Sequence, residues 1–351
     1  MVKRVVVIGG CGFVGTHICH LLRDRGYRAV AFDVRRTFDD LGAPDDSGWE
    51  VKLGSVQLEE DLVAAMDGAD FVIHTVAGHP FVEEWKHHEE MAIEGTKKVL
   101  SACRRAGVKR LVLCSSASIP YEYRDMQFGD ETLPPGTVED VYMRAKSMQE
   151  QIVIDANSPE LMTCSIRPHG IYGPGDRVFL PTVLEAAHSG KLKALIGDGC
   201  NLVDYTFVKN IANGLIMAGE ALGPGSPVCG SRYIVTDDCP THIWTLQSIA
   251  LARLGFAVPK RNLPLSFVYS LAVIASVVVR LINTVFRTKI QIGTFTPQKM
   301  ALVGTYRYYS VDKAKRDFGY KPLVPMKVAI DETIQSLWDM RNGGEYWAKK
   351  K

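Results

Sequence analysis

Three glycines that directly follow an apolar run near the amino terminus restrict the fold of this chain more than any other feature. Residues 5–15 read Val-Val-Val-Ile-Gly-Gly-Cys-Gly-Phe-Val-Gly. The glycines that set the spacing are Gly9, Gly12 and Gly15. A glycine turn between a strand and a helix lets the backbone approach a pyrophosphate, which then faces the amides of the helix N-terminus. The segment therefore predicts a dinucleotide-binding turn, to which Phe13 and Val14 also belong.

A second apolar run ends in an acidic residue at a fitting distance from this turn. Residues 29–32 have the pattern of a strand, and Asp33 follows, 18 residues after Gly15. A carboxylate at this point accepts hydrogen bonds from the ribose hydroxyls of the adenosine half and repels a 2′-phosphate. Arg35 and Arg36 come next and would instead bind that phosphate. Asp33 favours NAD as the cofactor, and NADP stays open as the alternative.

Short apolar runs alternate with longer amphipathic ones through the first half of the chain. The expected strands are 5–8, 29–32, 71–74, 111–114 and 163–166, and the expected helices are 11–25, 83–106 and 141–155. This alternation predicts an α/β fold, a Rossmann-type doubly wound parallel sheet. We expect an NAD-binding Rossmann domain over 1–235, with interleaved substrate loops from about 168, and a smaller C-terminal substrate lobe over 236–351.

The composition excludes several classes of partner. Lys+Arg number 41 and Asp+Glu number 39, and a net charge of +2 gives no general field for nucleic acid. The eight cysteines form no CxxC pair, and the histidines lack a spacing such as HExxH, so we expect no metal site. Free thiols fit a reducing compartment, which predicts a cytoplasmic location.

A tyrosine and a lysine four residues apart are the first catalytic candidates. Tyr142 and Lys146 fall on one face of the expected helix 141–155. A nearby ammonium favours the phenolate, so we expect Lys146 to lower the tyrosine pKa from its usual value of about 10. A serine turn, 115–118, follows the expected strand 111–114, at the strand end where open α/β sheets bind ligands. A serine there can hydrogen-bond a substrate oxygen while the tyrosine moves its proton.

Together these motifs resemble the extended short-chain dehydrogenase/reductase superfamily. Within it, the chain is most similar to the 3β-hydroxysteroid dehydrogenase branch, and most like the decarboxylating sterol-4α-carboxylate 3-dehydrogenases. The segments that carry the narrower likeness are 166–174, 201–208, 295–297, 308–310, 314–315 and 318–320. The resemblance implies oxidation of a secondary alcohol by hydride transfer to NAD. The preferred substrate is the 3β-hydroxyl of a sterol that carries a 4α-carboxylate, which is then lost as carbon dioxide.

The resemblance also implies a role for each motif residue. Tyr142 would be the general acid/base, Lys146 its electrostatic partner and a ligand of the nicotinamide ribose, and Ser116 the residue that orients the reacting oxygen. Ser118 would share that task, and Pro168 would lie against the nicotinamide. The neighbouring His169 is either a substrate ligand, for a carboxylate or hydroxyl, or a plain loop histidine.

Two positions depart from the family pattern. Ser55 stands where an aspartate usually follows Gly54, which weakens the expected adenine contact. Ala92 stands where an asparagine usually supports the proton relay of the lysine. Three rival functions stay open: a reductase of 2-alkyl-3-keto acids, a plain 3β-hydroxysteroid dehydrogenase, and a dinucleotide-binding regulatory protein. A homodimer is also possible.

The stretch 265–286 is unusually apolar. Residues 265–279 carry no charge, and Arg280 interrupts the run. Fifteen helical residues extend about 22 Å, less than the hydrocarbon core of about 30 Å. A core helix, an oligomer interface and a membrane segment all fit this pattern. Because a sterol resides in membranes, we predict peripheral or monotopic attachment on the cytosolic face, with Arg280, Arg287 and Lys289 at the headgroups.

Overall fold

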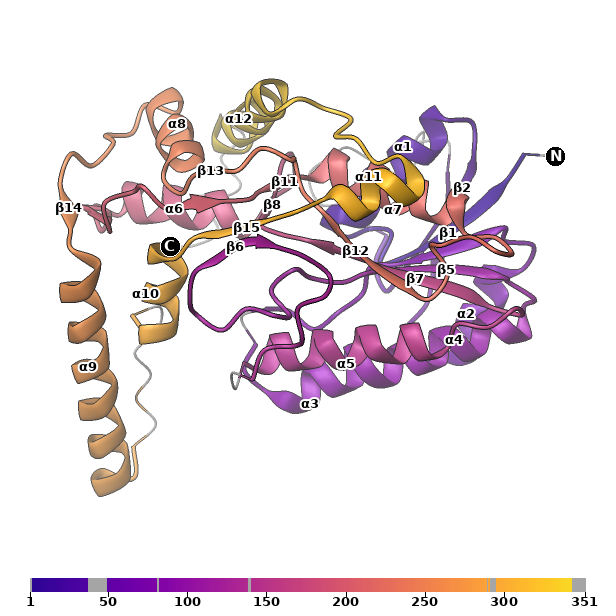
Figure 1. Ribbon diagram of the computed structural model, residues 1–351, viewed down its shortest axis with the longest axis horizontal. Helices are drawn as coiled ribbons and strands as arrows, with labels where there is room; N and C mark the ends of the chain where they lie inside the picture. Colours follow the sequence, from indigo (N-terminus) through magenta and orange to yellow (C-terminus); the bar gives the residue numbers. More distant parts are fainter. Residues whose placement is uncertain are drawn as a thin grey trace.

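A seven-stranded parallel sheet forms the centre of the molecule. The computed structural model describes residues 2–36, 49–80, 82–137, 140–288, 290 and 295–342. The strand order is β12-β7-β5-β4-β1-β2-β3, and all neighbours in it are parallel (Figure 1). Because the order reverses between β1 and β4, ligands are expected at the carboxyl ends of these two strands. The predicted Rossmann-type doubly wound fold is therefore confirmed.

The strands are short and almost entirely buried. Their bounds are β1 Arg4–Ile8, β2 Arg28–Asp33, β3 Glu50–Leu53, β4 Phe71–His74, β5 Arg110–Cys114, β7 Met162–Pro168 and β12 Ser231–Val235. In β1, Val5 and Val7 point into one hydrophobic cluster, whereas Val6 and Ile8 point into the other. Helices cover both faces of the sheet, which is why the central strands have continuous apolar sequences rather than alternating ones.

Two helix layers enclose this sheet (Figure 1). The first layer contains α1 Phe13–Asp24, α7 Val208–Ala221 and α11 Asp312–Phe318. The second contains α2 Glu59–Met66, α4 Gly95–Arg105 and α5 Val141–Asp155. The helix expected over 83–106 begins at Trp85 and is not uniform, because α3 Trp85–His88 leads into a π-helical turn, η2 Glu89–Glu94, before α4.

A smaller set of elements forms a second lobe. Its four-stranded sheet has the order β13-β10-β15-β6. The strands are β13 Thr241–His242, β10 Leu202–Val203, β15 Arg307–Tyr309 and β6 Met126–Gly129. The helices α6 Phe179–His188, α8 Thr245–Arg253 and α12 Met326–Asn342 enclose a separate apolar cluster. Short two-stranded pairings join β8 Ile171–Tyr172 to β11 Thr206–Phe207, and β9 Leu195–Ile196 to β14 Asn262–Leu263.

The apolar stretch forms one helix, α9 Leu265–Phe286, that projects from the body of the molecule (Figure 1). Its 22 residues continue through Arg280, and at 1.5 Å per residue they extend about 33 Å. The helix is therefore longer than the fifteen residues of the uncharged run, because one exposed arginine is readily accommodated in a helix. Only 11% of its most apolar window is buried, so it is not a core helix. Lys289 lies outside the described residues.

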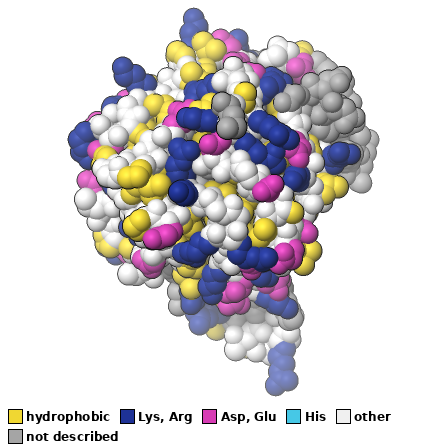
Figure 2. Space-filling model, turned by 90° about the vertical axis from the view of Figure 1, so that its right-hand side faces the viewer, with side chains coloured by type: hydrophobic (Ala, Val, Ile, Leu, Met, Phe, Trp, Pro, Cys, Tyr) yellow, Lys and Arg dark blue, Asp and Glu magenta, His cyan; other side chains and the backbone are white. Residues whose placement is uncertain are grey.

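Surface charges are mixed in sign. On the face drawn in Figure 2, basic side chains are interspersed with acidic ones, with no single-sign surface. This distribution agrees with the near balance of 41 basic and 39 acidic residues. A mixed surface of this kind gives no long-range field toward a polyanion.

Candidate active site

The turn at the end of β1 packs so closely against its neighbours that two of its positions accept only glycine. Gly9 has a φ of +82°, and its N–H donates to the Phe32 carbonyl at 2.9 Å. A β-carbon on Gly9 would lie 2.5 Å from the Thr75 hydroxyl oxygen, and one on Gly15 would lie 2.0 Å from the Gly9 carbonyl oxygen. Any side chain at either position would therefore push the turn away from the strand end.

The turn also leaves the N-terminus of α1 open. The N-cap is Gly12, which has no side chain to occupy the free amides, and the first helical turn holds no acidic residue. The first amides of a helix have no partner within it and attract anions. This geometry suits a phosphate group.

Asp33 lies at the carboxyl end of β2, beside this turn. Its carboxylate accepts hydrogen bonds from the Cys11 N–H at 3.1 Å and the Arg35 N–H at 3.3 Å. These two backbone donors fix the carboxylate at the edge of the sheet. Ser55, which replaces the usual aspartate, caps a turn instead, because its hydroxyl accepts from the Gln57 N–H at 3.1 Å.

One cavity of about 450 Å³ joins the glycine turn to the catalytic candidates. Its lining includes Gly9, Gly12, Phe13, Val14, Gly15, Asp33, Arg35, Thr75, Val76, Ser115, Tyr142 and Lys146. A concave site that combines open amides, an acidic edge and a glycine cradle fits an NAD molecule. Arg36, Ser116, Ser118, Pro168 and His169 are not among the described residues that line it.

Tyr142 is the second residue of α5. Asp140 caps the start of this helix, because its carboxylate accepts a hydrogen bond from the Met143 N–H at 2.8 Å. Burial, as the largest cause, raises the pKa of Tyr142 to about 12, and a hydrogen bond with Ser116 acts in the opposite direction. The expected lowering by Lys146 is absent from these causes. The phenol is thus held protonated at neutral pH by its surroundings in the protein.

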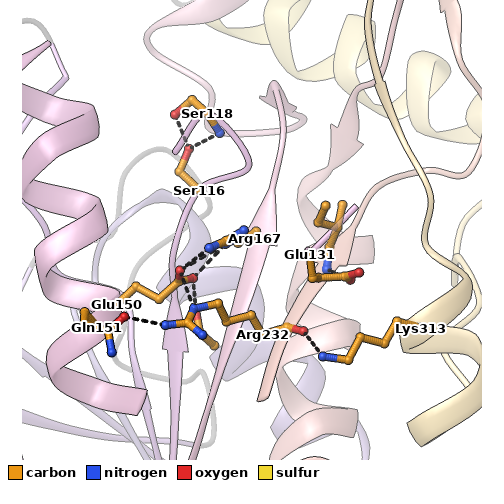
Figure 3. Close-up of polar contacts among 10 residues, drawn as sticks. Ser116, Ser118, Glu131, Glu150, Gln151, Arg167, Arg232 and Lys313 are labelled. Carbon is orange, nitrogen blue, oxygen red and sulfur yellow. Dashed lines mark hydrogen bonds and ion pairs between the residues drawn. The ribbon is translucent and has the colours of Figure 1, made fainter. Parts of the chain in front are cut away.

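The serine turn after β5 places two hydroxyls together. The Ser116 and Ser118 hydroxyl oxygens are 2.7 Å apart, and the Ser118 N–H donates to the Ser116 oxygen at 3.3 Å (Figure 3). The Pro168 carbonyl accepts from the Ala117 N–H at 2.9 Å, which places the end of β7 beside this turn. Ser116, Tyr142 and Pro168 are therefore near neighbours although they come from three separate elements.

Lys146 is almost entirely buried beneath the cavity. Its ammonium donates to the Cys114 carbonyl at 2.8 Å and to the Gln149 side-chain oxygen at 3.1 Å. Burial lowers its pKa, while Cys114 and Glu150 act to raise it. Gln149 was not identified in the sequence, because a single glutamine on a helix has no motif to distinguish it.

Glu150, the next residue of α5, fixes the helix to the sheet (Figure 3). Its carboxylate pairs with Arg167 of β7 at 2.5 Å and with Arg232 of β12 at 3.1 Å. It also accepts from the Ser165 hydroxyl at 2.6 Å. Because Arg167 and Glu150 are both buried, removing one partner would leave the other charge unpaired.

His169 points away from the cavity, toward the second lobe. Its Nδ1 donates to the Asp204 carbonyl at 2.7 Å, and burial, the largest cause, lowers its pKa to about 3. The neutral ring presents Nε2 to Arg307, whose Nη1 lies 3.5 Å away. His169 therefore lies beside a cation, and its assignment as a substrate ligand or as a plain loop histidine stays a prediction.

Arg307 is a second residue that the sequence did not single out. It is half-buried, its guanidinium lies 5.3 Å from the centre of the Tyr121 ring, and it donates to the Leu302 carbonyl. Its Nε is buried without a hydrogen-bond partner. In the part of the chain that the structure describes, none of these partners is a carboxylate. Among the described residues, the charge is instead stabilised by the Tyr121 ring, the Leu302 carbonyl and the neutral His169 ring.

Within the described ranges 2–36, 49–80, 82–137, 140–288, 290 and 295–342, no three His, Cys, Asp or Glu side chains are grouped as a metal site would require. His74 is instead hydrogen-bonded to Thr96 at 3.0 Å, and His88 to the Val82 carbonyl at 2.7 Å. Both histidines are fully buried.

Comparison with known proteins gives the family. A profile of the 3-beta hydroxysteroid dehydrogenase/isomerase family matches residues 6–265. The chain is 38% identical to the decarboxylating sterol-4-alpha-carboxylate 3-dehydrogenase of Mus musculus, over 97% of this chain and 92% of that protein. It is 40% identical to the protein of the same name from Bos taurus, over 97% and 94% respectively.

The fold has solved counterparts as well. The Bordetella bronchiseptica enzyme WbmH in complex with NAD+ superposes with a TM-score of 0.73, at 18% identity, over 99% of each chain. At this identity the likeness concerns the fold alone. The family profile and the two relatives show that the chain belongs to the 3-beta hydroxysteroid dehydrogenase/isomerase family.

Proposed function

We propose that this chain is an NAD-dependent 3β-hydroxysteroid dehydrogenase that oxidises a 4α-carboxysterol and releases carbon dioxide. The observation that carries the proposal is that Tyr142 and Lys146 line the same cavity as the glycine turn and Asp33. The relatives named sterol-4-alpha-carboxylate 3-dehydrogenase support the substrate class, because they align over 97% of the chain.

The cofactor half of the cavity would hold NAD through backbone and acid contacts. Gly9, Gly12 and Gly15 would admit the pyrophosphate, and Asp33 would accept from the adenosine ribose hydroxyls. Phe13 and Val14 would contribute amides at the start of α1, and Pro168 would lie against the nicotinamide. When bound, NAD supplies the hydride acceptor. Arg35 also lines the cavity, so binding of NADP is the alternative that a direct comparison tests.

The catalytic residues would act on the substrate hydroxyl. Ser116, with Ser118 behind it, would hold the hydroxyl oxygen by a hydrogen bond. Tyr142 would accept the hydroxyl proton as its phenolate while the carbon-bound hydrogen leaves as hydride. Because burial raises the tyrosine pKa to about 12, the reactive phenolate needs the Lys146 ammonium and the Ser116 hydroxyl for stabilisation.

Arg307 is the candidate counter-ion for the substrate carboxylate. Arg307 is half-buried and has no carboxylate partner among the residues that the structure describes, and such a guanidinium is stabilised by any anion that reaches it. Oxidation turns the substrate into a β-keto acid. The carboxyl carbon then leaves as carbon dioxide, its bonding electrons pass into the ketone as an enolate, and protonation completes the product. This chemistry uses no metal ion. His169, neutral and beside Arg307, would orient that guanidinium.

The division at residue 235 is part of the proposal. The last strand of the main sheet, β12, ends at Val235, and α8, α9 and α12 follow it. We assign 1–235 to the NAD-binding domain, with substrate loops from about 168, and 236–351 to the substrate lobe. A homodimer stays a prediction from the sequence.

We propose further that α9 binds the cytosolic face of a membrane. The most apolar 18-residue window of the helix has a mean hydropathy of 2.2, and the helix exposes Phe267, Leu271, Ile274, Val277 and Leu281, among other apolar residues. Basic residues flank it at both ends, Lys260 and Arg261 before it and Arg287 after it. A lipid bilayer satisfies an apolar surface with basic ends.

The chain's path favours insertion from one side over a complete span. After α9, the helix α10 Pro297–Gly304 packs back against its first half, where Val268 and Ala272 contact Met300. The chain therefore returns to the body from which α9 left. A helix that crossed the bilayer would leave β15, α11 and α12 on the far side, although β15 pairs with β6 and β10, α11 packs on β12, and α12 packs on α8.

The test is a panel of purified substrates with NAD. Turnover of a 4α-carboxysterol with NADH formation supports the proposal. Turnover restricted to uncharged 3β-sterols would indicate a plain 3β-hydroxysteroid dehydrogenase, and turnover restricted to 2-alkyl-3-hydroxy acids would indicate the hydrocarbon-synthesis enzyme. NAD binding without turnover of any of these substrates would indicate a dinucleotide-binding regulatory protein.

A further inference from the structure

A buried chain of side-chain hydrogen bonds runs from Lys146 into the body of the protein. The Gln149 side-chain oxygen accepts from the Lys146 ammonium at 3.1 Å, and its nitrogen donates to the Val76 carbonyl and the Thr96 hydroxyl, both at 2.9 Å. The Thr96 hydroxyl in turn lies 3.0 Å from the His74 Nε2. Gln149, Thr96 and His74 are each 0% exposed.

The orientation of the Gln149 amide follows from its partners. The Val76 carbonyl can only accept a hydrogen bond, so the amide nitrogen must face it. The Lys146 ammonium can only donate, so the amide oxygen must face the lysine. Reversing the amide would place its oxygen against the Val76 carbonyl oxygen and its NH₂ group against the Lys146 ammonium, so only one orientation fits.

The remaining partners keep the chain electrically neutral. Because Thr96 accepts from Gln149, its own proton is available to His74. Burial, with Lys146 as a second cause, lowers the pKa of His74 to about 3, so the ring is neutral and accepts at Nε2. The His74 Nδ1 is buried without a partner and ends the chain. These groups hold Gln149 in place but supply no countercharge.

Two of the three N–H groups of Lys146 are thereby committed. One donates to the Cys114 carbonyl at 2.8 Å and one to Gln149. The third is left for the cavity, which Lys146 lines together with Tyr142. Two fixed acceptors below an ammonium determine the direction of its third N–H, because the three hydrogens are tetrahedral about the nitrogen.

We propose that Gln149 is a positioning residue for Lys146. It holds the ammonium charged within a buried environment and directs the third N–H toward the cofactor ribose and the Tyr142 oxygen. Thr96 acts one step further away by orienting the Gln149 amide. The inference rests on the proposed dehydrogenase function for its catalytic consequence, but its effect on the lysine is a property of the protein without substrate.

Two other groups and burial also influence the charge of Lys146. Glu150 of α5 and Cys114 of β5 act to raise its pKa, whereas burial, the largest cause, lowers it. The neighbouring His74 of β4 is neutral. Glu150 is itself paired with two arginines, so the neutral acceptor Gln149 becomes important for the ammonium. Loss of the amide should lower the lysine pKa further.

The direct test is NMR titration of Lys146 in protein labelled at the lysine ε-carbon, with Lys146→Met to assign the signal. In Gln149→Leu the lysine should titrate at lower pH than in the wild type, and NAD affinity should fall several-fold. Thr96→Val should shift the titration in the same direction by less. Gln335→Leu makes the same chemical change at an exposed position on α12, far from this network, and should shift nothing.

Activity gives an independent readout. In oxidation Tyr142 acts as its phenolate, so a less charged lysine raises the apparent pKa of the acid limb of kcat/KM. We expect that limb in Gln149→Leu to move up by about one pH unit, roughly a tenfold loss at a fixed pH below it.

An unchanged lysine titration in folded Gln149→Leu would overturn the proposal, and Thr96→Val decides the question if Gln149→Leu does not fold. A shifted lysine titration in a protein without dehydrogenase activity would contradict the proposed function and leave the positioning role intact.

Discussion

The cofactor half and the substrate half of this molecule differ in how completely the chain satisfies its own groups. Around Lys146, each strong polar contact comes from the protein: Cys114, Gln149 and, through Thr96, His74. In the substrate half, Arg307 has no carboxylate among its partners in the described part of the chain, and α9 exposes a long apolar surface. The first half is ready to bind a ligand of fixed shape, whereas the groups of the second half are the ones for which we propose an anion and a lipid surface as partners.

The largest effect on activity is expected from a substitution in the cofactor half. Tyr142→Phe removes the oxygen that takes the substrate proton, and we expect turnover to fall about 10²–10⁴-fold. NAD affinity should stay within a few-fold, because the glycine turn and Asp33 are untouched. Steady-state kinetics and calorimetric NAD binding check both. Near-normal turnover in a folded variant would remove Tyr142 from the mechanism.

A double substitution in the apolar helix α9 tests the substrate half. Val273 and Val277 are 37% and 53% exposed, one turn apart on α9. Replacing both with Asp should weaken liposome binding by about 100-fold, because a carboxylate is costly to place in lipid. Flotation with anionic vesicles measures it, and turnover of a water-soluble alcohol should persist.

Folding and assembly controls decide what a failure means for α9. Unfolding of the double variant would return α9 to the core, contrary to its exposure. Unchanged vesicle binding would place the attachment elsewhere. A dimer in the wild type that dissociates in the variant, with no vesicle binding in either, would make a second copy of the chain the partner of α9.

Arg307 sharpens the comparison on the substrate side. Arg307→Gln should lower kcat/KM for a 4α-carboxysterol by about 10–100-fold, the range of a charge-assisted hydrogen bond of about 1.5–3 kcal/mol. For the matching 3β-sterol without the carboxylate, kcat/KM should change little. Equal losses on both substrates would show that Arg307 only supports the structure around Tyr121.

The smallest expected effect concerns the choice of cofactor. Asp33→Ala removes an acceptor for the ribose hydroxyls and a charge that repels a 2′-phosphate, so NAD affinity should fall about tenfold. The preference for NAD over NADP should narrow. Competition binding of the two cofactors measures this, and a wild type that already prefers NADP would mean that Arg35 and Arg36 determine the choice.

Local patterns predicted the parts of the structure that depend on neighbours in sequence. The glycine turn, the flanking strands and the helix of Tyr142 were all predicted, because each depends on spacing over fewer than about 20 residues. The length of α9 was underestimated, because only the fifteen uncharged residues before Arg280 were counted as helical. The direction of the Tyr142 pKa was also missed, since burial depends on the packing of distant elements.

Two contacts across long sequence separations that lie outside the motifs were not predicted. Arg307 meets His169 from 138 residues away, and Gln149 meets Val76 from 73 residues away. Neither residue belongs to a motif, and either could have been a surface side chain. Their importance appears only in the folded structure, which brings the Arg307 guanidinium next to His169 and the Gln149 amide next to Lys146.

The central claim is that one site oxidises the 3β-hydroxyl and thereby releases the neighbouring carboxylate. The most direct measurement is the ratio of labelled carbon dioxide to NADH formed from a 4α-carboxysterol labelled in its carboxyl group. The account predicts one carbon dioxide for each NADH, and loss of both products in Tyr142→Phe. NADH without carbon dioxide from the wild type would contradict it, as would carbon dioxide release that survives in the Tyr142 variant.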